Sequence, residues 1–186
     1  PAAVRAMAHA MLDPLEGEES FPFDRIVQVS NGLPYFIFEM CHYLLDKGAL
    51  RQREDGYVWM SPDGALGVPD SVTGIIEARL GELSQEASDV IQRASVVGQN
   101  FWLGALGDAS RNSAVLDELV EREFIRSNHA SQIPNEREYA FTSSLVRETI
   151  RSSLPENRRR LIHSGVCDWL ETLTIANNLE IQMFLA

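Results

Sequence analysis

The side chains that most often carry chemistry are few and scattered in this chain. The histidines and cysteines are His9, Cys41, His42, His129, His163 and Cys167. No two of them show the His-x-x-x-His or Cys-x-x-Cys spacing with which proteins commonly hold zinc. We therefore predict single histidines without a metal. Both cysteines are embedded in apolar helical patterns, which predicts buried, reduced thiols, with a disulfide or a metal pair as the alternatives.

Two motifs of catalytic sites are missing. The sequence has no Gly-x-Ser-x-Gly nucleophile elbow, and no Gly-Lys-Ser/Thr step of a phosphate-binding loop. A phosphate cradle needs backbone amides bared by glycine and a lysine on the outer phosphates. We predict that this chain is not itself an enzyme and cannot hydrolyse ATP by that route.

One short motif, Gly32-Leu33-Pro34, could touch a ligand. A glycine lets the backbone come close to a ligand, and a rigid proline ring can cover the face of a base. The same residues also read as a simple helix start, with a glycine stop followed by a proline in the first helical turn. Both interpretations stand on these residues alone.

The net charge and the distribution of apolar residues indicate which classes of partner are disfavoured. The formal net charge is −11, which disfavours a protein that grips nucleic acid through its phosphates. No apolar run approaches the roughly 18 residues that a membrane helix needs, so we expect no membrane partner. The start Pro1-Ala2-Ala3 lacks an initiator Met and the order of a signal peptide. We expect a fragment excised from a longer, cytoplasmic protein.

The first half of the chain is predicted to be mostly helical. The expected helices are 2–12, 24–30, 34–47 and 72–80. Asn31-Gly32 and Gly48 supply stops, and Asp70-Ser71 supplies a cap. Asp55-Gly56 between short strand-like runs at 50–52 and 57–59 predicts a hairpin.

The second half alternates helices with short strands. A helix from the Ser84 cap to Gly98, a short helix over 101–106 and a helix over 113–123 capped by Asn112-Ser113 are expected first. Strands at 124–126 and 139–141 follow, and then helices over 145–152 and from 156 onward. Three helices before a two-stranded hairpin is the order of a winged helix.

A cluster of arginines lies near the second-half helices: Arg147, Arg151, Arg158, Arg159 and Arg160. One interpretation is a solvated face whose arginines pair with Glu148 and Glu156. The other is contact with an acidic neighbour, such as another domain.

Three stretches together resemble one family. Ser30-Asn31-Gly32-Leu33-Pro34-Tyr35-Phe36-Ile37-Phe38-Glu39 resembles the Ser-x-Gly-x-Pro-x-Phe-x-x-Glu motif of STAND ATPases, the AAA-like regulators found in LuxR-type transcription factors and in cyclase-linked or kinase-linked sensors. The stretches 68–72, 78–80 and 94–101 are similar to the entry of their winged helix, and 139–148 and 154–159 to its second strand and the helix after it. The resemblance spans about residues 24–171.

The resemblance implies a nucleotide site shared with a core outside this chain. In the family, the proline of Gly-x-Pro packs on the adenine of ATP or ADP, so Gly32, Leu33 and Pro34 are the implied contacts. Many members carry a phosphate-sensing histidine two residues after the wing phenylalanine, and Ser143 stands at that place here. A serine can donate one hydrogen bond but cannot supply a cationic imidazole.

The overall prediction is a mainly α protein. It comprises a helical lid (1–52), a linker with a hairpin (53–67), a winged-helix domain with a small β-hairpin wing (68–155) and the start of a helical region (156–186). Its expected partners are its own upstream NTPase core and downstream helical domain. The expected function is to couple the ATP/ADP state of that core to an output domain. The alternatives are a nucleotide-insensitive interaction scaffold and a DNA-binding winged helix, which the acidic helix 113–123 disfavours.

Overall fold

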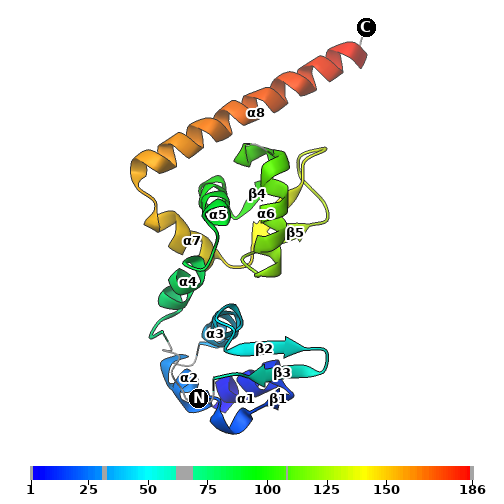
Figure 1. Cartoon of the computed structure of the whole chain (residues 1–186). Helices are drawn as coiled ribbons and strands as arrows, with labels where there is room; N and C mark the ends of the chain where they lie inside the picture. The colour runs from blue at the N-terminus through cyan, green and yellow to red at the C-terminus, as the bar shows by residue number, and fades with distance from the viewer. Residues whose placement is uncertain (1, 31–32, 62–68, 108, 185–186) are drawn as a thin grey trace. The chain divides into compact units, whose positions relative to one another are not determined.

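The computed structural model describes residues 2–30, 33–61, 69–107 and 109–184, with side chains for 5–30, 33–61, 69–107 and 114–173. The described chain is mostly helical with two small sheets, which confirms the mainly α class (Figure 1). It divides into two compact units, residues 1–82 and 83–186.

Helices α1 (Ala2–Leu12), α2 (Phe23–Ser30), α3 (Pro34–Asp46) and α4 (Val72–Leu80) form most of the first unit. Helix α3 is its centre, because the apolar side chains of Phe36, Ile37, Met40 and Leu44 are at most 1% exposed. Leu33 is extended at the N-cap and Pro34 occupies the first turn, where a missing N–H costs nothing. The predicted helices of this unit are confirmed within a residue or so.

A sheet in the order β1-β3-β2 completes this unit. Strands β2 (Leu50–Arg53) and β3 (Gly56–Trp59) pair antiparallel and confirm the predicted hairpin. The short strand β1 (Leu15–Glu16), which the sequence analysis did not predict, pairs parallel with β3, and a 3₁₀ turn η1 (Glu18–Ser20) follows it. Gly56 is required here, since a Cβ would lie 2.4 Å from the carbonyl oxygen of Pro14.

The second unit begins with α5 (Gln85–Val97), whose N-cap Ser84 accepts a 3.1 Å hydrogen bond from the Ala87 N–H. It continues with β4 (Asn100–Trp102), a 3₁₀ turn η2 (Gly104–Leu106), α6 (Ala109–Glu121), β5 (Ile125–Asn128) and β6 (Glu138–Phe141). The strands form a sheet in the order β4-β6-β5, with both pairs antiparallel. The strands expected at 124–126 and 139–141 are thereby confirmed.

Two expectations in this unit are wrong. Residues 101–106 are not a short helix, because β4 pairs with β6 through Phe101 and Tyr139, and only a 3₁₀ turn follows. Asn112 and Ser113 do not cap α6, since this helix already begins at Ala109. A strand of three residues has no room for the alternation that identifies a strand in sequence.

The unit ends with two helices. Helix α7 (Ser144–Ser153) is followed by Leu154, whose backbone is extended before Pro155. Helix α8 (Glu156–Phe184) packs on α5 and η2. Both helices confirm the expectation. No helix of the described residues is long and apolar enough to cross a membrane.

The compact units divide the chain elsewhere than the expected domains. Helix α4 falls in the range 68–155 assigned to the second domain, yet it packs on α3 of the first unit. Helix α8, assigned to a separate region, belongs to the second unit. The division between the units follows Glu82, in the short connection between α4 and α5.

Candidate functional site

The predicted ligand contacts Leu33 and Pro34 lie side by side at the exposed start of α3. Leu33 is 56% exposed and Pro34 is also exposed. Their position is fixed by the backbone, because the Leu33 N–H donates to the Ser30 carbonyl and the Phe36 N–H donates to the Leu33 carbonyl. Gly32 lies outside the described residues. The apolar start of this helix is thus presented to solvent on an ordered backbone.

A row of aromatic side chains continues from this start along α3. Tyr35, Phe38 and His42 are half-buried and recur at helical spacing. The rings of Tyr35 and Phe38 stack with centroids 6.1 Å apart, and His42 meets Phe38 edge-on at 4.4 Å. Together with Pro34, these three rings form an apolar, aromatic surface at the start of α3. Such a surface is suited to contact the flat ring of a ligand.

A buried ion network lies beneath this surface. Arg79 of α4 donates to Glu39 at 2.6 Å and to Asp46 at 2.8 Å, and the hydroxyl of Tyr35 donates to Glu39. The Arg79 and Glu39 side chains are each 1% exposed. Unpairing a buried charge is costly, so this network ties both an early turn of α3, at Glu39, and its last residue, Asp46, to α4. The sequence signal was available: Glu39 lies on the apolar face of α3, where a carboxylate needs a partner.

Ser143 lies in the other unit and serves as a helix cap. It is extended at the N-cap of α7, and its Oγ accepts a 3.0 Å hydrogen bond from the Leu145 N–H. Its carbonyl accepts from the Arg147 N–H. The hydroxyl hydrogen is still able to donate to a ligand. Of the four predicted contacts, the structure brings together Leu33 and Pro34.

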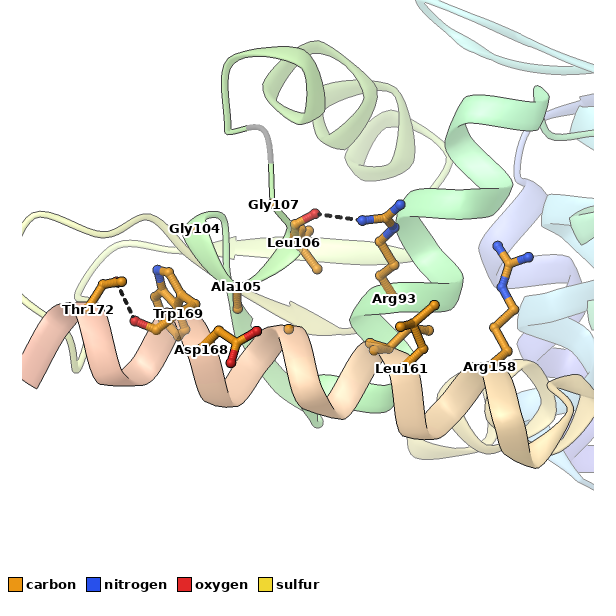
Figure 2. Close-up of a pocket in the computed structure, with 12 residues that line it drawn as sticks. Arg93, Gly104, Ala105, Leu106, Gly107, Arg158, Leu161, Asp168, Trp169 and Thr172 are labelled. Carbon is orange, nitrogen blue, oxygen red and sulfur yellow. Dashed lines mark hydrogen bonds between the residues drawn. The ribbon is translucent and has the colours of Figure 1, made fainter.

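The second unit contains a groove that sequence analysis missed. It encloses about 650 Å³ between α8 and the segments α5 and η2 (Figure 2). Its lining residues are Arg93, Gly104, Ala105, Leu106, Gly107, Arg158, Leu161, Ile162, Gly165, Asp168, Trp169 and Thr172. The groove is assembled from parts of the chain far apart in sequence, which no local pattern reveals.

Close packing at Gly104 and Trp169 fixes one side of the groove. The Trp169 ring stacks near Trp102, with centroids 6.2 Å apart. The Gly104 N–H donates to Glu136 at 3.0 Å. A Cβ at Gly104 would lie 2.5 Å from Trp169 Nε1, so a glycine is needed for α8 to approach η2.

Four of the five clustered arginines form ion pairs within the second unit. Arg147 and Arg151 contact Glu148, and Arg160 contacts Glu156, which confirms the expected pairing. Arg147 also donates to the Ser95 carbonyl, and Arg158 bonds Asp89 at 2.7 Å. Near the end of α6, the acidic residues Asp117, Glu118 and Glu121 precede Arg122 in the sequence, and the Arg122 guanidinium lies 3.5 Å from Glu118.

The two cysteines differ in environment. Cys41 is buried, and burial raises the pKa of its thiol to about 12. Cys167 is exposed, so the expectation of a buried thiol is wrong there. Only one face of α8 packs against the rest of the unit, and Cys167 lies outside that face. Among the described residues, no three His, Cys, Asp or Glu side chains are grouped to hold a metal ion.

Comparison with known proteins gives one distant relative. The chain is 25% identical, over 175 residues, to an uncharacterized protein of Rhizobium meliloti (strain 1021). The alignment covers 85% of this chain but 16% of that protein, so the chain spans about a sixth of the relative's length. No family model matches the chain, and no solved structure matches it.

Proposed function

We propose that the chain is a non-catalytic regulatory segment of a STAND-type signalling ATPase. Its first unit acts as the lid that closes over ATP or ADP held by a core elsewhere in a longer, cytoplasmic protein. Its second unit is a winged-helix arm that passes the nucleotide state to an output domain. Such a switch needs two arrangements of similar energy that the two nucleotides stabilise differently.

The observation that carries this proposal is the start of α3. Leu33 and Pro34 are exposed, yet the turn beside them is tied to α4 through Tyr35, Glu39 and Arg79. An exposed proline ring on a fixed backbone is suited to pack on a base with little entropy to lose. A bound nucleotide would supply the phosphate charge and the base that the first unit, as a lid, recognises.

The order of elements in the second unit supports the winged-helix part. Helix α5, strand β4, the turn η2, helix α6 and the hairpin β5–β6 follow one another, and β4 pairs on the far side of β6 from β5. This order of elements is the one expected for a winged helix, and it therefore supports that part of the proposal. In the family that the sequence resembles, this module packs and switches.

Ser143 fits the nucleotide-sensing role in part. Its oxygen already accepts the Leu145 N–H, so it is committed as a cap, and its hydrogen can donate to one phosphate oxygen. It lacks the positive charge of a histidine. We therefore assign nucleotide retention mainly to Pro34 and only a minor contribution to Ser143.

The test uses the full-length protein that contains this chain. Bound nucleotide and ATP turnover are measured for the wild type and for Pro34→Ala. Losing two ring methylenes at about 0.8 kcal/mol each predicts about tenfold weaker retention. Pro134→Ala, which changes an exposed proline of the second unit, is the matched control. Unchanged retention in Pro34→Ala, with the protein folded, contradicts the base contact.

A second function of another class has one observation in its favour. The commitment of Ser143 to capping α7 suits an interaction scaffold that has lost nucleotide sensitivity. A scaffold predicts that deleting residues 1–186 from the full-length protein leaves nucleotide content and turnover unchanged, whereas a lid predicts that both change.

DNA binding is the third candidate. The acidic side chains near the end of α6 repel phosphates, so filter binding should show little DNA retained and no steep dependence on salt. A steep decrease in DNA binding with rising salt would revive this candidate.

A further inference from the structure

One stripe of α8, exposed to solvent, runs along the groove of the second unit. Arg158, Leu161, Gly165, Asp168 and Thr172 recur every three or four residues and all line the groove. Figure 2 shows the labelled members of this set projecting from the side of α8 that faces α5 and η2. Residues at this spacing share one face of a helix, so the groove offers a continuous strip to another helix. We call these five residues the α8 stripe.

The centre of the α8 stripe pairs a large apolar side chain with a small gap. Leu161 is 75% exposed, the largest exposure among the large apolar side chains of the described residues. One turn later, a Cβ placed at Gly165 would meet no described atom within 4 Å. An exposed leucine beside an open glycine forms a knob and a hole, which is the geometry of closely packed helices.

The ends of the α8 stripe carry opposite charges. Arg158 lies at the start, with Arg93 of α5 lining the same groove, and Asp168 lies three turns later. Arg158 already bonds Asp89, while Asp168 is exposed and forms no ion pair with the described residues. A single groove thus has two arginines toward one end and an unpaired carboxylate toward the other.

We propose that the α8 stripe binds a second copy of itself, with the two α8 helices antiparallel. In this arrangement, Leu161 of each copy enters the gap at Gly165 of the other, and Asp168 of each copy meets Arg158 and Arg93 of the other. Both pairs are centred on the level of His163, so one two-fold axis satisfies all of them at once. A parallel arrangement fails, because it sets like charges together.

The apolar pair and the charged pair share one midpoint along α8, and this favours a second copy of the chain over an unrelated helix. A two-fold contact needs a surface that is complementary to itself, and the α8 stripe matches large to small and positive to negative about one point. The inference concerns the second unit alone and does not depend on the proposed nucleotide function.

The primary experiment is sedimentation equilibrium of the full 186-residue chain, from about 1 µM to about 1 mM. Salt of about 0.15 M screens the repulsion between two copies of charge −11 beyond about 8 Å. A monomer–dimer equilibrium is expected. Leu161→Glu should weaken dimerisation by at least about tenfold, since it sets a carboxylate against the other copy's helix. Leu170→Glu, on an exposed leucine outside the stripe, is the matched control and should leave dimerisation unchanged.

A second variant separates a lost interface from a lost fold. Gly165→Leu fills the gap that the other copy's Leu161 would enter, yet a leucine favours a helix more than a glycine does. We expect this variant to be at least as stable as the wild type on thermal unfolding and to be monomeric. His163→Leu, two residues away on the opposite face of the helix, is its control and should still dimerise.

The register is tested by cross-linking. In a Cys167→Ser background, chains with Leu161→Cys are mixed with chains with Gly165→Cys, and a mild oxidant converts facing thiol pairs to disulfides. The mixture should give more cross-linked dimer than either variant alone. A chain that stays monomeric, a dimer that persists in both Leu161→Glu and Gly165→Leu, or equal cross-linking in all samples overturns the proposal and leaves the groove to a different helix.

Discussion

The two units each bury a glutamate, and they satisfy it in different ways. Glu39 in the first unit is 1% exposed and is held by the charged Arg79 from another helix. Glu138 in the second unit is 2% exposed and accepts from neutral donors nearby, the Gln132 N–H and the Asn128 amide, each at 2.8 Å. One carboxylate joins distant segments, while the other organises the connection between β5 and β6.

The two buried carboxylates differ in what the loss of a partner would cost. Removing the partner of Glu39 leaves an unpaired charge in a core, which costs far more than losing one neutral hydrogen bond. In the first unit, the charge of Glu39 is balanced by Arg79 of α4, and the Tyr35 hydroxyl donates to it as well. In the second unit, two neutral donors close in sequence, Gln132 and Asn128, satisfy Glu138.

The largest effect is expected from breaking the first arrangement. Arg79→Met should lower the free energy of unfolding of the first unit by about 3–5 kcal/mol, because Glu39 stays buried without its cation. Hydrogen exchange of α3 and α4 peptides measures this unit by itself. Arg25→Met, at an exposed arginine of the same unit, should change stability by less than about 0.5 kcal/mol. Equal protection in all three proteins would refute the assignment.

Removing the charge of the second glutamate should cost less. Glu138→Gln should lower the stability of the second unit by about 1–3 kcal/mol, because one of the two donors loses its acceptor. Exchange of peptides over 125–141 measures the loss.

The effect of Glu138 should also depend on pH. The Gln132 N–H, and then the Asn128 amide, lower the pKa of Glu138 from its ordinary 4.5. Its stabilising contribution is therefore complete above pH 4.5 and is lost as the pH falls through the lower folded pKa. The difference between wild type and Glu138→Gln should shrink below that pH; a constant difference would contradict this explanation.

Gly104→Ala tests the packing of α8 on η2, which joins distant parts of the second unit. The new Cβ would approach Trp169 Nε1 and Glu136 Oε1 within 3 Å, so α8 must shift away from η2. We expect a loss of about 1–3 kcal/mol and faster proteolysis within α8. His163→Ala, at an exposed residue on the face of α8 opposite the groove, is the control and should leave proteolysis unchanged.

The smallest effect is expected at the local cap of α7. Ser143→Ala should cost about 1 kcal/mol of helix stability, and Ser143→Asp should restore it, because an aspartate also caps. Circular dichroism during thermal unfolding measures both. If Ser143 acts only as a cap, nucleotide retention of the full-length protein should follow stability in both variants. Retention that is lost with Ser143→Asp while the fold is restored would show contact with an anion.

Local signals in the sequence predicted most of the helices. Ser71 and Ser84 cap the helices that follow them, and Pro34 begins α3, as their residue types indicate. Asp55-Gly56 placed the hairpin. These features depend on hydrogen bonds within a few residues, so a single sequence carries them.

Features formed by distant residues were missed. Strand β4 has only three residues and exists because β6 pairs with it, so the local pattern over 101–106 wrongly predicts a helix. The Glu39–Arg79 pair joins residues 40 apart. The groove beside α8 depends on Gly104 meeting Trp169. The exposed start at Leu33 and Pro34 was predicted as a site, but its attachment to α4 was not.

The two cysteines differ in burial, so their rates of alkylation can be compared to measure how often the core around α3 opens. Cys41 is buried in the first unit with a thiol pKa of about 12, so it can react with an alkylating reagent only after that part of the core has opened. Cys167 is exposed on α8 and reacts without such opening. Mass spectrometry gives the rate at which each cysteine is alkylated. The slower rate of Cys41 therefore reports the rate of local opening around α3 in the unaltered protein.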